Sequence, residues 1–231
     1  MDHGLNGMGG KLESIVFDFD GTLAELHLDF NDMKRRIGAL AREYLRSEPT
    51  PSALVPALEW LKSLCASVHE LDPTASVEFR TRADGLIVDM ELDAARRGCL
   101  FPFTRPLLLD LAQRGVKVAI ITRNCEEAVR LVFPDLEGYC GCFLARGHVP
   151  RVKPDPDHLL QAIGKLSATP GKTLMVGDHP IDIRTGKGAG TLTAGVWSGH
   201  ATEADLAGSG PDWMARNCEA LMTLLRERSI L

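Results

Sequence analysis

The chain has 231 residues, a length that suits one large domain or a core domain with a smaller companion. Its 26 Lys and Arg residues against 31 Asp and Glu residues give a formal net charge of −5, which excludes the strongly basic surface of a general nucleic-acid-binding protein. Hydrophobic residues at 45% and charged residues at 25% are ordinary for a globular protein and exclude extensive disorder.

The first segment, residues 1–11, is rich in glycine and polar residues, and we predict that it is a flexible tail. This segment lacks the apolar stretch of a secretory signal peptide. No apolar run elsewhere approaches the roughly 18 residues that a membrane span needs. Six cysteines are too few for a disulfide-stapled scaffold. These features predict a cytoplasmic protein that binds neither nucleic acid nor membrane.

Short apolar runs alternate with helical patterns along most of the chain. The runs predict strands at residues 14–17, 116–121, 142–144, 173–176 and 191–197. The helical patterns predict helices at residues 106–114, 125–133, 157–167, 181–189 and 217–228. Strands separated by helices of about ten residues indicate right-handed βαβ units around a parallel sheet. We therefore predict an α/β fold with a Rossmann-like three-layer core, whose ligand binds at the carboxyl ends of the strands.

One connection, residues 24–100, has 77 residues, whereas a βαβ crossover needs only about a dozen. Leucines and a valine recur at helical spacing within it, at Leu54, Leu58, Leu61, Leu64, Val68 and Leu71. Residues 32–45 and 77–97 are also predicted to be helical, with prolines at positions 49, 51 and 73 as interruptions. Extra helices packed on the core sheet would fit this pattern, as would a separate helical cap over the ligand edge. We favour the cap, because both ends of the connection adjoin candidate active-site segments.

The first candidate site segment follows the first predicted strand. While the chain stays extended, Asp18 and Asp20 point to one face and Phe17 and Phe19 to the other. Two neighbouring carboxylates repel each other, so a proton or a cation is needed between them. Taken alone, such a pair is more often explained by turn and capping chemistry.

The next two segments also lie where strands end or helices begin. Thr122, Arg123 and Asn124 offer hydroxyl, amide and N–H groups that suit a phosphoryl oxygen. In isolation, capping of the next helix by Thr122 or Asn124 is the better explanation. Lys153 stands beside a proline just ahead of a predicted helix, where its charge would neutralise a nucleophile and a phosphate. A single lysine at such a place is usually a solvated surface residue.

The fourth segment follows the strand at residues 173–176. Asp178 and Asp182 supply the hard oxygen ligands that suit Mg2+, which is commonly held by one or two carboxylates, a phosphate and water. Helix capping is again the plainer alternative, because a carboxylate in the first turn of a helix is stabilising.

The combination of segments is more specific than its parts. Four motifs occur in order, namely DFDGTL at Asp18–Leu23, IITRN around Thr122, VKPDP around Lys153 and GDHPID at Gly177–Asp182. With them the chain resembles the haloacid dehalogenase superfamily of phosphohydrolases. The resemblance covers residues 12–23 and 101–231, which would form the catalytic core, and leaves residues 24–100 as the cap domain.

The resemblance implies a role for each motif residue. Asp18 is expected to be the nucleophile that forms an aspartyl-phosphate, and Asp20 the acid and then the base. The third residue expected to be catalytic is Lys153, which would pair with Asp18. The residues expected to bind the phosphoryl group are Thr122, Arg123, Asn124 and Lys153. The residues expected at Mg2+ are Asp18, Asp20 through its main-chain carbonyl, Asp178 and Asp182 through its water shell.

Two features of the sequence narrow the range of reactions that the resemblance allows. Asp20 is the acid/base carboxylate expected of phosphatases and phosphomutases, and the long connection lies between the first and second motifs, as in the helical-cap class of the family. The arrangement most resembles phosphoglycolate phosphatases. We predict a Mg2+-dependent phosphomonoester hydrolase acting on a small phosphorylated metabolite, with phosphoglycolate as the leading candidate. A phosphomutase of the β-phosphoglucomutase type and a non-catalytic phosphate-binding or signalling module are the alternatives.

Some arginines and cysteines have plainer explanations. Arg35, Arg36, Arg80 and Arg82 lie in the predicted cap, where they could reach a carboxylate or a second phosphate of the substrate. We favour the plainer interpretation, that they lie on solvated faces of amphipathic helices. Cys125, Cys140 and Cys142 are interpreted as buried thiols, because a lone C-x-C pair is weak evidence for zinc.

Overall fold

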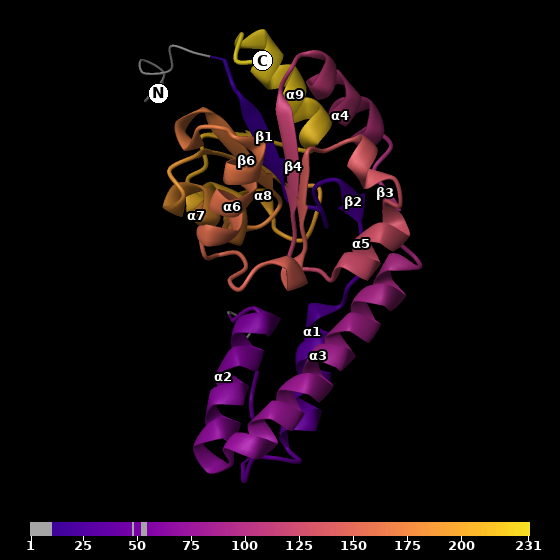
Figure 1. The fold of residues 1–231 in the computed structure, drawn as a ribbon, viewed down its shortest axis with the longest axis vertical. Helices are drawn as coiled ribbons and strands as arrows, with labels where there is room; N and C mark the ends of the chain where they lie inside the picture. The colour runs from indigo at the N-terminus through magenta and orange to yellow at the C-terminus, as the bar shows by residue number, and fades with distance from the viewer. Residues whose placement is uncertain (1–10, 48, 52–54) are drawn as a thin grey trace. The chain divides into compact units, whose positions relative to one another are not determined.

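The computed structural model describes residues 11–47, 49–51 and 55–231 (Figure 1). The chain forms two compact units. The first runs to Leu26 and resumes at Gly98, and the second spans His27–Arg97. The predicted flexible tail, residues 1–11, lies outside the described residues except for Lys11.

The first unit is built on a parallel sheet of six described strands (Figure 1). The strands are β1 (Ser14–Phe17), β4 (Lys117–Ile121), β5 (Cys142–Leu144), β6 (Thr173–Gly177), β7 (Leu192–Val196) and β8 (Trp213–Ala215). Their order across the sheet is β5-β4-β1-β6-β7-β8. The chain leaves β1 toward β4 on one side and later reaches β6 on the other, so β1 borders the switch point at which open α/β sheets bind ligands.

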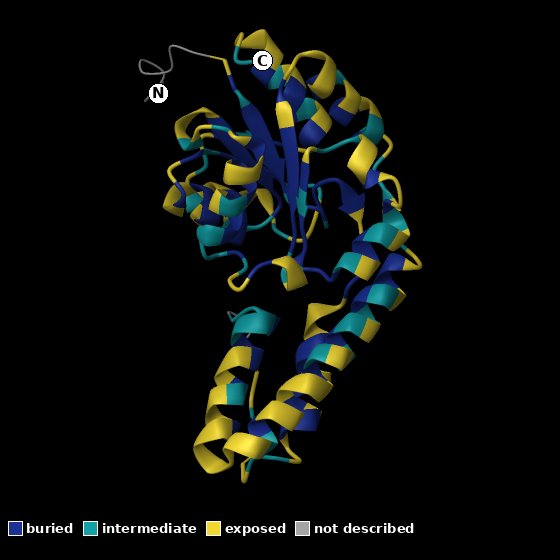
Figure 2. Ribbon diagram, in the orientation of Figure 1, coloured by how far each residue is buried: buried dark blue, intermediate teal, exposed yellow. Residues whose placement is uncertain are grey.

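Helices cover both faces of this sheet. They are α4 (Thr104–Gln113), α5 (Glu126–Val132), α6 (Asp157–Leu166), α7 (Pro180–Gly188), α8 (Glu203–Ser209) and α9 (Cys218–Glu227). Side chains alternate along β1: Ile15 and Phe17 share a core cluster with α4, α5 and α9, whereas Val16 packs in a separate cluster with α6. Figure 2 shows the strands as the buried interior of this unit. The predicted three-layer α/β fold is confirmed.

Predicted and observed elements of this unit agree to within about two residues at each end. Two elements were not predicted from the pattern, β8 and α8. A two-stranded antiparallel sheet, β2 (Ala24–Glu25) with β3 (Cys99–Leu100), was also missed. Strands of two residues are too short to show a period, so only their pairing identifies β2 and β3. β8 is a run of three apolar residues, as β5 is, and a run of this length allows a strand or a loop, so its pairing with β7 decides. Among its described residues this unit also has three short 3-10 helices, at Leu136–Gly138, Arg146–His148 and Pro170–Lys172.

The described part of the second unit contains three helices, α1 (Phe30–Ala41), α2 (Ala57–Leu71) and α3 (Pro73–Ala95). They enclose a core of their own, which includes Met33, Ile37, Trp60, Leu61, Leu64, Val68, Phe79 and Ile87. Of the residues that predicted the central helix, Leu54 lies outside the described residues and Leu71 is exposed. That this unit acts as a cap stays a prediction.

Two helix boundaries in this unit differ from the prediction. Helix α3 begins at Pro73, four residues before the predicted start at Val77, because the Asp72 side chain accepts hydrogen bonds from the N–H groups of Thr74 and Ala75. Proline suits the first position of a helix, so Pro73 starts α3 as well as ending α2. Helix α1 ends at Ala41 and continues only as turns. No helix in the described part of the chain is long and apolar enough to span a bilayer.

Candidate active site

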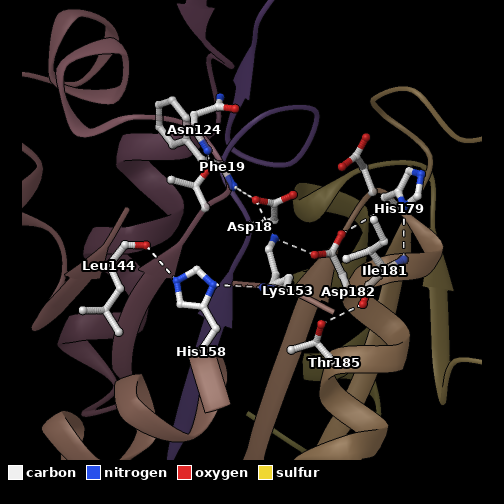
Figure 3. Close-up of polar contacts among 12 residues, drawn as sticks. Asp18, Phe19, Asn124, Leu144, Lys153, His158, His179, Ile181, Asp182 and Thr185 are labelled. Carbon is white, nitrogen blue, oxygen red and sulfur yellow. Dashed lines mark hydrogen bonds and ion pairs between the residues drawn. The ribbon is translucent and has the colours of Figure 1, made fainter. Parts of the chain in front are cut away.

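The four motif segments meet at the carboxyl edge of the parallel sheet (Figure 3). Asp18 follows β1, Thr122 follows β4 and Asp178 follows β6, while Lys153 lies in the loop that leads into α6. Parallel strands direct their carboxyl ends to one edge, which is why segments more than a hundred residues apart in sequence converge here.

Lys153 lies at the centre of the cluster and is 1% exposed. Its Nζ lies 2.8 Å from Asp18 Oδ1 and 2.6 Å from Asp182 Oδ1 (Figure 3). Burial alone would lower the pKa of Lys153, but the attraction of Asp18 and Asp182 outweighs it, so the pKa is raised. The lysine is therefore a fixed positive charge beside the carboxylate that ends β1, and the interpretation as a solvated surface residue is wrong.

The turn after β1 is tightly packed. Asp18 Oδ1 accepts a hydrogen bond from the Phe19 N–H at 2.7 Å, and Asp20 Oδ1 accepts one from the Leu26 N–H at 3.0 Å. Gly21 has a φ of +74°, and a Cβ at this position would lie 2.3 Å from Asp178 Oδ2. Only glycine allows both this conformation and this close approach.

The environment of Asp20 suits proton transfer. Burial raises the pKa of its carboxyl, His200 opposes the rise, and the neighbouring carboxylates of Asp178 and Asp18 add to it, giving a value of about 7. A carboxyl group with such a pKa holds a proton or releases it near neutral pH, which general acid–base catalysis requires.

Three carboxylates form a candidate metal centre. Asp18, Asp178 and Asp182 each offer an oxygen, and these oxygens lie within 4.8 Å of one another. Burial raises the pKa of Asp18 and of Asp182, while the Lys153 charge opposes the rise. One ammonium does not balance three carboxylates, so a divalent cation would complete the charge. An all-oxygen donor set fits Mg2+, the metal that the sequence predicted.

Asp182 has two roles at once. Its Oδ2 accepts the His179 N–H at 3.1 Å in a capping box at the start of α7, while Oδ1 contacts Lys153. A Cβ at Gly177 would lie 2.2 Å from Asp182, so that glycine makes room for the carboxylate. The sequence left helix capping and site chemistry as alternatives for this residue, and the geometry shows a cap that also touches the lysine.

The segment after β4 offers donors for an anion. Thr122 is 1% exposed, and its Oγ1 accepts a hydrogen bond from the Asn124 N–H at 3.2 Å. The residue that caps α5 is Cys125, so neither Thr122 nor Asn124 fills the capping position that was their plainer explanation. Within the described residues the buried Nδ2 of Asn124 makes no hydrogen bond. Arg123 is half-buried between these two residues.

Two histidines beside the site were missed from the sequence. His200 lies in the loop between β7 and α8, and its main-chain N–H donates to Asp178 Oδ2 at 2.8 Å. His158 is fully buried on α6 and contacts the main chain of Lys153. The only available signal for His158 was a polar residue on the apolar face of a helix five positions after Lys153.

The arginines of the second unit pair with neighbouring carboxylates on its surface. Arg35 and Arg36 contact Asp32, Arg80 contacts Asp84, and Arg82 contacts Glu43. These exposed pairs confirm the interpretation as solvated helix faces. Of the cysteines considered above, Cys125 and Cys142 are buried and Cys140 is half-buried.

Known proteins resemble this chain over most of its length. A family model described as haloacid dehalogenase-like hydrolase matches residues 12–190. Pyrophosphatase PpaX of Bacillus cereus is 34% identical over 222 residues, which cover 94% of this chain and 98% of that protein. The crystal structure of a hydrolase from Pseudomonas syringae has a TM-score of 0.67 at 22% identity and covers 93% of this chain and 98% of its own. The structure described as a predicted phosphoglycolate phosphatase from Haemophilus somnus has a TM-score of 0.64 at 19% identity, with 92% and 97% coverage.

Proposed function

We propose that this chain, which belongs to the haloacid dehalogenase-like hydrolases and is an enzyme of the phosphatase type, hydrolyses a small phosphomonoester. In this proposal the reaction passes through an aspartyl-phosphate and uses Mg2+. The observation that carries this proposal is the buried contact of Lys153 with Asp18, next to two further carboxylates. A lysine that neutralises a nucleophilic carboxylate, beside oxygen ligands for a divalent cation, suits attack on an anionic phosphate.

In the first step an oxygen of Asp18 attacks the phosphorus. The Asp18–phosphorus bond forms as the bond from phosphorus to the leaving oxygen breaks, and Asp20 donates its proton to that oxygen. Oδ1 of Asp18 is already engaged by Lys153 and the Phe19 N–H, so we assign the attack to Oδ2.

In the second step a water molecule attacks the phosphorus of the aspartyl-phosphate. Asp20, now ionised, accepts the proton of that water, and the bond between Asp18 and phosphorus breaks to release inorganic phosphate. The pKa of about 7 allows Asp20 to serve in both directions near neutral pH.

The remaining motif residues hold the phosphoryl group and the metal. Thr122, the main-chain N–H groups of Arg123 and Asn124, and Lys153 would donate hydrogen bonds to the phosphoryl oxygens. Mg2+ would be held by Asp18, Asp178 and the main-chain carbonyl of Asp20, with Asp182 supporting its water shell. The metal supplies the positive charge that lets an anionic carboxylate approach an anionic phosphate.

We propose phosphoglycolate as the leading substrate and residues 27–97 as the unit that selects it. The Bacillus cereus relative is named a pyrophosphatase, so inorganic pyrophosphate belongs in any test beside the monoesters. Phosphoglycolate and pyrophosphate would each present a terminal phosphoryl group to the same nucleophile. They differ in the leaving group that is bonded to this phosphoryl group.

The test is release of inorganic phosphate from phosphoglycolate, sugar phosphates, nucleoside monophosphates and pyrophosphate, with Mg2+ and then with EDTA. Release that needs Mg2+ and is concentrated on one monoester supports the proposal. Isomerisation of a sugar phosphate, primed by its bisphosphate and without net release, would favour the phosphomutase. No release from any compound by folded protein with Mg2+ would favour the non-catalytic module.

A further inference from the structure

His158 is a buried side chain to which the mechanism above gives no role. It lies on α6 with 0% of its surface exposed. Its Nδ1 accepts a hydrogen bond from the Lys153 main-chain N–H at 3.3 Å, and its Nε2 lies 3.1 Å from the main-chain oxygen of Leu144 (Figure 3). An amide N–H only donates and a carbonyl oxygen only accepts, so the imidazole carries its proton on Nε2.

The carbonyl that His158 contacts has a second donor. Leu144 ends β5, and its oxygen also accepts the main-chain N–H of Thr122 at 3.0 Å. Thr122 lies just beyond the end of β4, the strand next to β5. A continuous path therefore runs from the Thr122 N–H through the Leu144 oxygen and the imidazole to the Lys153 N–H.

The imidazole is neutral in this setting. Burial, and to a smaller extent the nearby Lys153 ammonium, lower the pKa of His158 to about 4, against smaller opposing effects of the Leu144 carbonyl and Asp157. His148 also lowers it. A neutral ring with one donor and one acceptor matches the one carbonyl and one amide that it meets.

We propose that His158 is a positioning residue that ties the main chain of Lys153 to that of Thr122 and so sets the spacing of the two side chains that hold the phosphoryl group. This inference rests on the proposed phosphatase function. Displacement of a binding group by about 1 Å is enough to cost about 100-fold in rate, so a spacer between the lysine and the threonine has a measurable effect. The competing explanation is a core histidine whose hydrogen bonds merely stabilise the fold.

Three substitutions separate these explanations. His158→Leu removes both hydrogen bonds. His158→Asn keeps an oxygen where Nδ1 lies and so retains the link to Lys153, whereas His158→Gln reaches the Nε2 position and retains the link to Leu144. Leu159→Ala is the matched control, because Leu159 is equally buried on the same helix and its truncation destabilises the fold without removing a hydrogen bond of the path.

The experiment measures kcat and KM for the best monoester, the affinity for inorganic phosphate by calorimetry with Mg2+, and thermal unfolding. We expect His158→Leu to lower kcat/KM by about 10- to 100-fold and to weaken phosphate binding. His158→Asn and His158→Gln should each restore part of both losses. Leu159→Ala should lower the unfolding temperature at unchanged phosphate affinity. Equal phosphate affinities for wild type and His158→Leu would overturn the proposal, as would equal losses for His158→Leu and Leu159→Ala.

A direct readout of the imidazole keeps this inference separate from the proposed function. Long-range 1H–15N correlation spectra of the wild type should show a protonated Nε2 and an unprotonated Nδ1 at neutral pH. A proton on Nδ1 would contradict the path whatever the activity. If the wild type binds inorganic phosphate but releases none from any monoester, the hydrolase proposal fails, and the phosphate affinities of the variants still decide the role of His158.

Discussion

The two compact units of this chain use charge in different ways. In the first, Lys153 pairs with both Asp18 and Asp182, and the side chains of Lys153 and Asp182 are each 1% exposed. In the second, the pair between Arg82 and Glu43 leaves 43% and 54% of those side chains exposed. Exposed pairs are worth little and are screened by water, whereas a buried pair carries a desolvation cost that only close contacts offset. The cost of burial is therefore concentrated where the chemistry is expected.

Asp18→Asn tests this contrast most strongly. The amide keeps the shape of the side chain but is a poor nucleophile, so we expect turnover to fall by about 10⁴-fold or more. Asp84→Asn, in the second unit, removes only an exposed partner of Arg80 and should leave turnover unchanged. Phosphate release measured on both variants decides the matter, and substantial turnover by Asp18→Asn would remove Asp18 as the nucleophile.

Lys153→Met compares a buried cation with an exposed one. Without the ammonium, Asp18 and Asp182 are left buried near each other, so we expect the free energy of unfolding in urea to fall by about 3 to 5 kcal/mol. Arg82→Met removes an exposed cation and should leave the urea midpoint where it is. Equal midpoints for the two variants would contradict the contrast.

We expect the free energy of unfolding to fall at acidic pH because His158 is buried in its neutral form. The ordinary histidine pKa of 6.5 falls to about 4 in the folded protein, so below pH 6.5 the unfolded chain binds this proton more readily. The stability present above pH 6.5 is then lost as the pH falls toward 4, by about 3 kcal/mol from this residue. In urea unfolding at pH 7 and at pH 4, His158→Asn should lose less stability than the wild type. An identical loss in both proteins would show that His158 titrates normally.

Replacement of a glycine by alanine should have opposite effects in the two units, and the gain in stability at Gly85 is the smallest effect that we expect. Gly85→Ala lies on the exposed face of α3, where a Cβ meets nothing within 4 Å, and should raise the stability by about 0.5 to 1 kcal/mol. Gly21→Ala meets the Asp178 carboxylate at a positive φ and should lower both stability and turnover. Thermal unfolding of the pair checks both, and a stabilised Gly21→Ala would refute the close packing described here.

Features set by neighbouring residues were predictable from the sequence. The strand of Ser14–Phe17 and the carboxylates after it follow from an apolar run that stops at Asp18. Because parallel strands share a carboxyl edge, Thr122 and Asp178 were expected near Asp18, and the structure brings them to the same edge. The three-layer fold followed from the same alternation of strands and helices.

Features set by distant partners were not predictable. The contact between Asp182 and Lys153 joins residues 29 positions apart and exists only in the folded chain. β8 has three residues, and its place is defined by pairing with β7. The role of Asp72 as the cap of α3 was readable in principle, but Pro73 was interpreted only as an interruption. In each case a short local pattern allowed several structures, and tertiary contacts chose one.

The position of β1 in the sheet also has a consequence for synthesis on the ribosome. Ser14–Phe17 pairs with residues 117–120 on one side and with residues 173–176 on the other. More than 150 further residues must therefore be synthesised after β1 before its second neighbour in the sheet, β6, is available. The helices within His27–Arg97, by contrast, pack against helices close to them in sequence. A nascent chain would fold the helical unit early and carry an apolar strand without its sheet until late. Such a chain depends on prompt completion, or on a chaperone, to avoid aggregation.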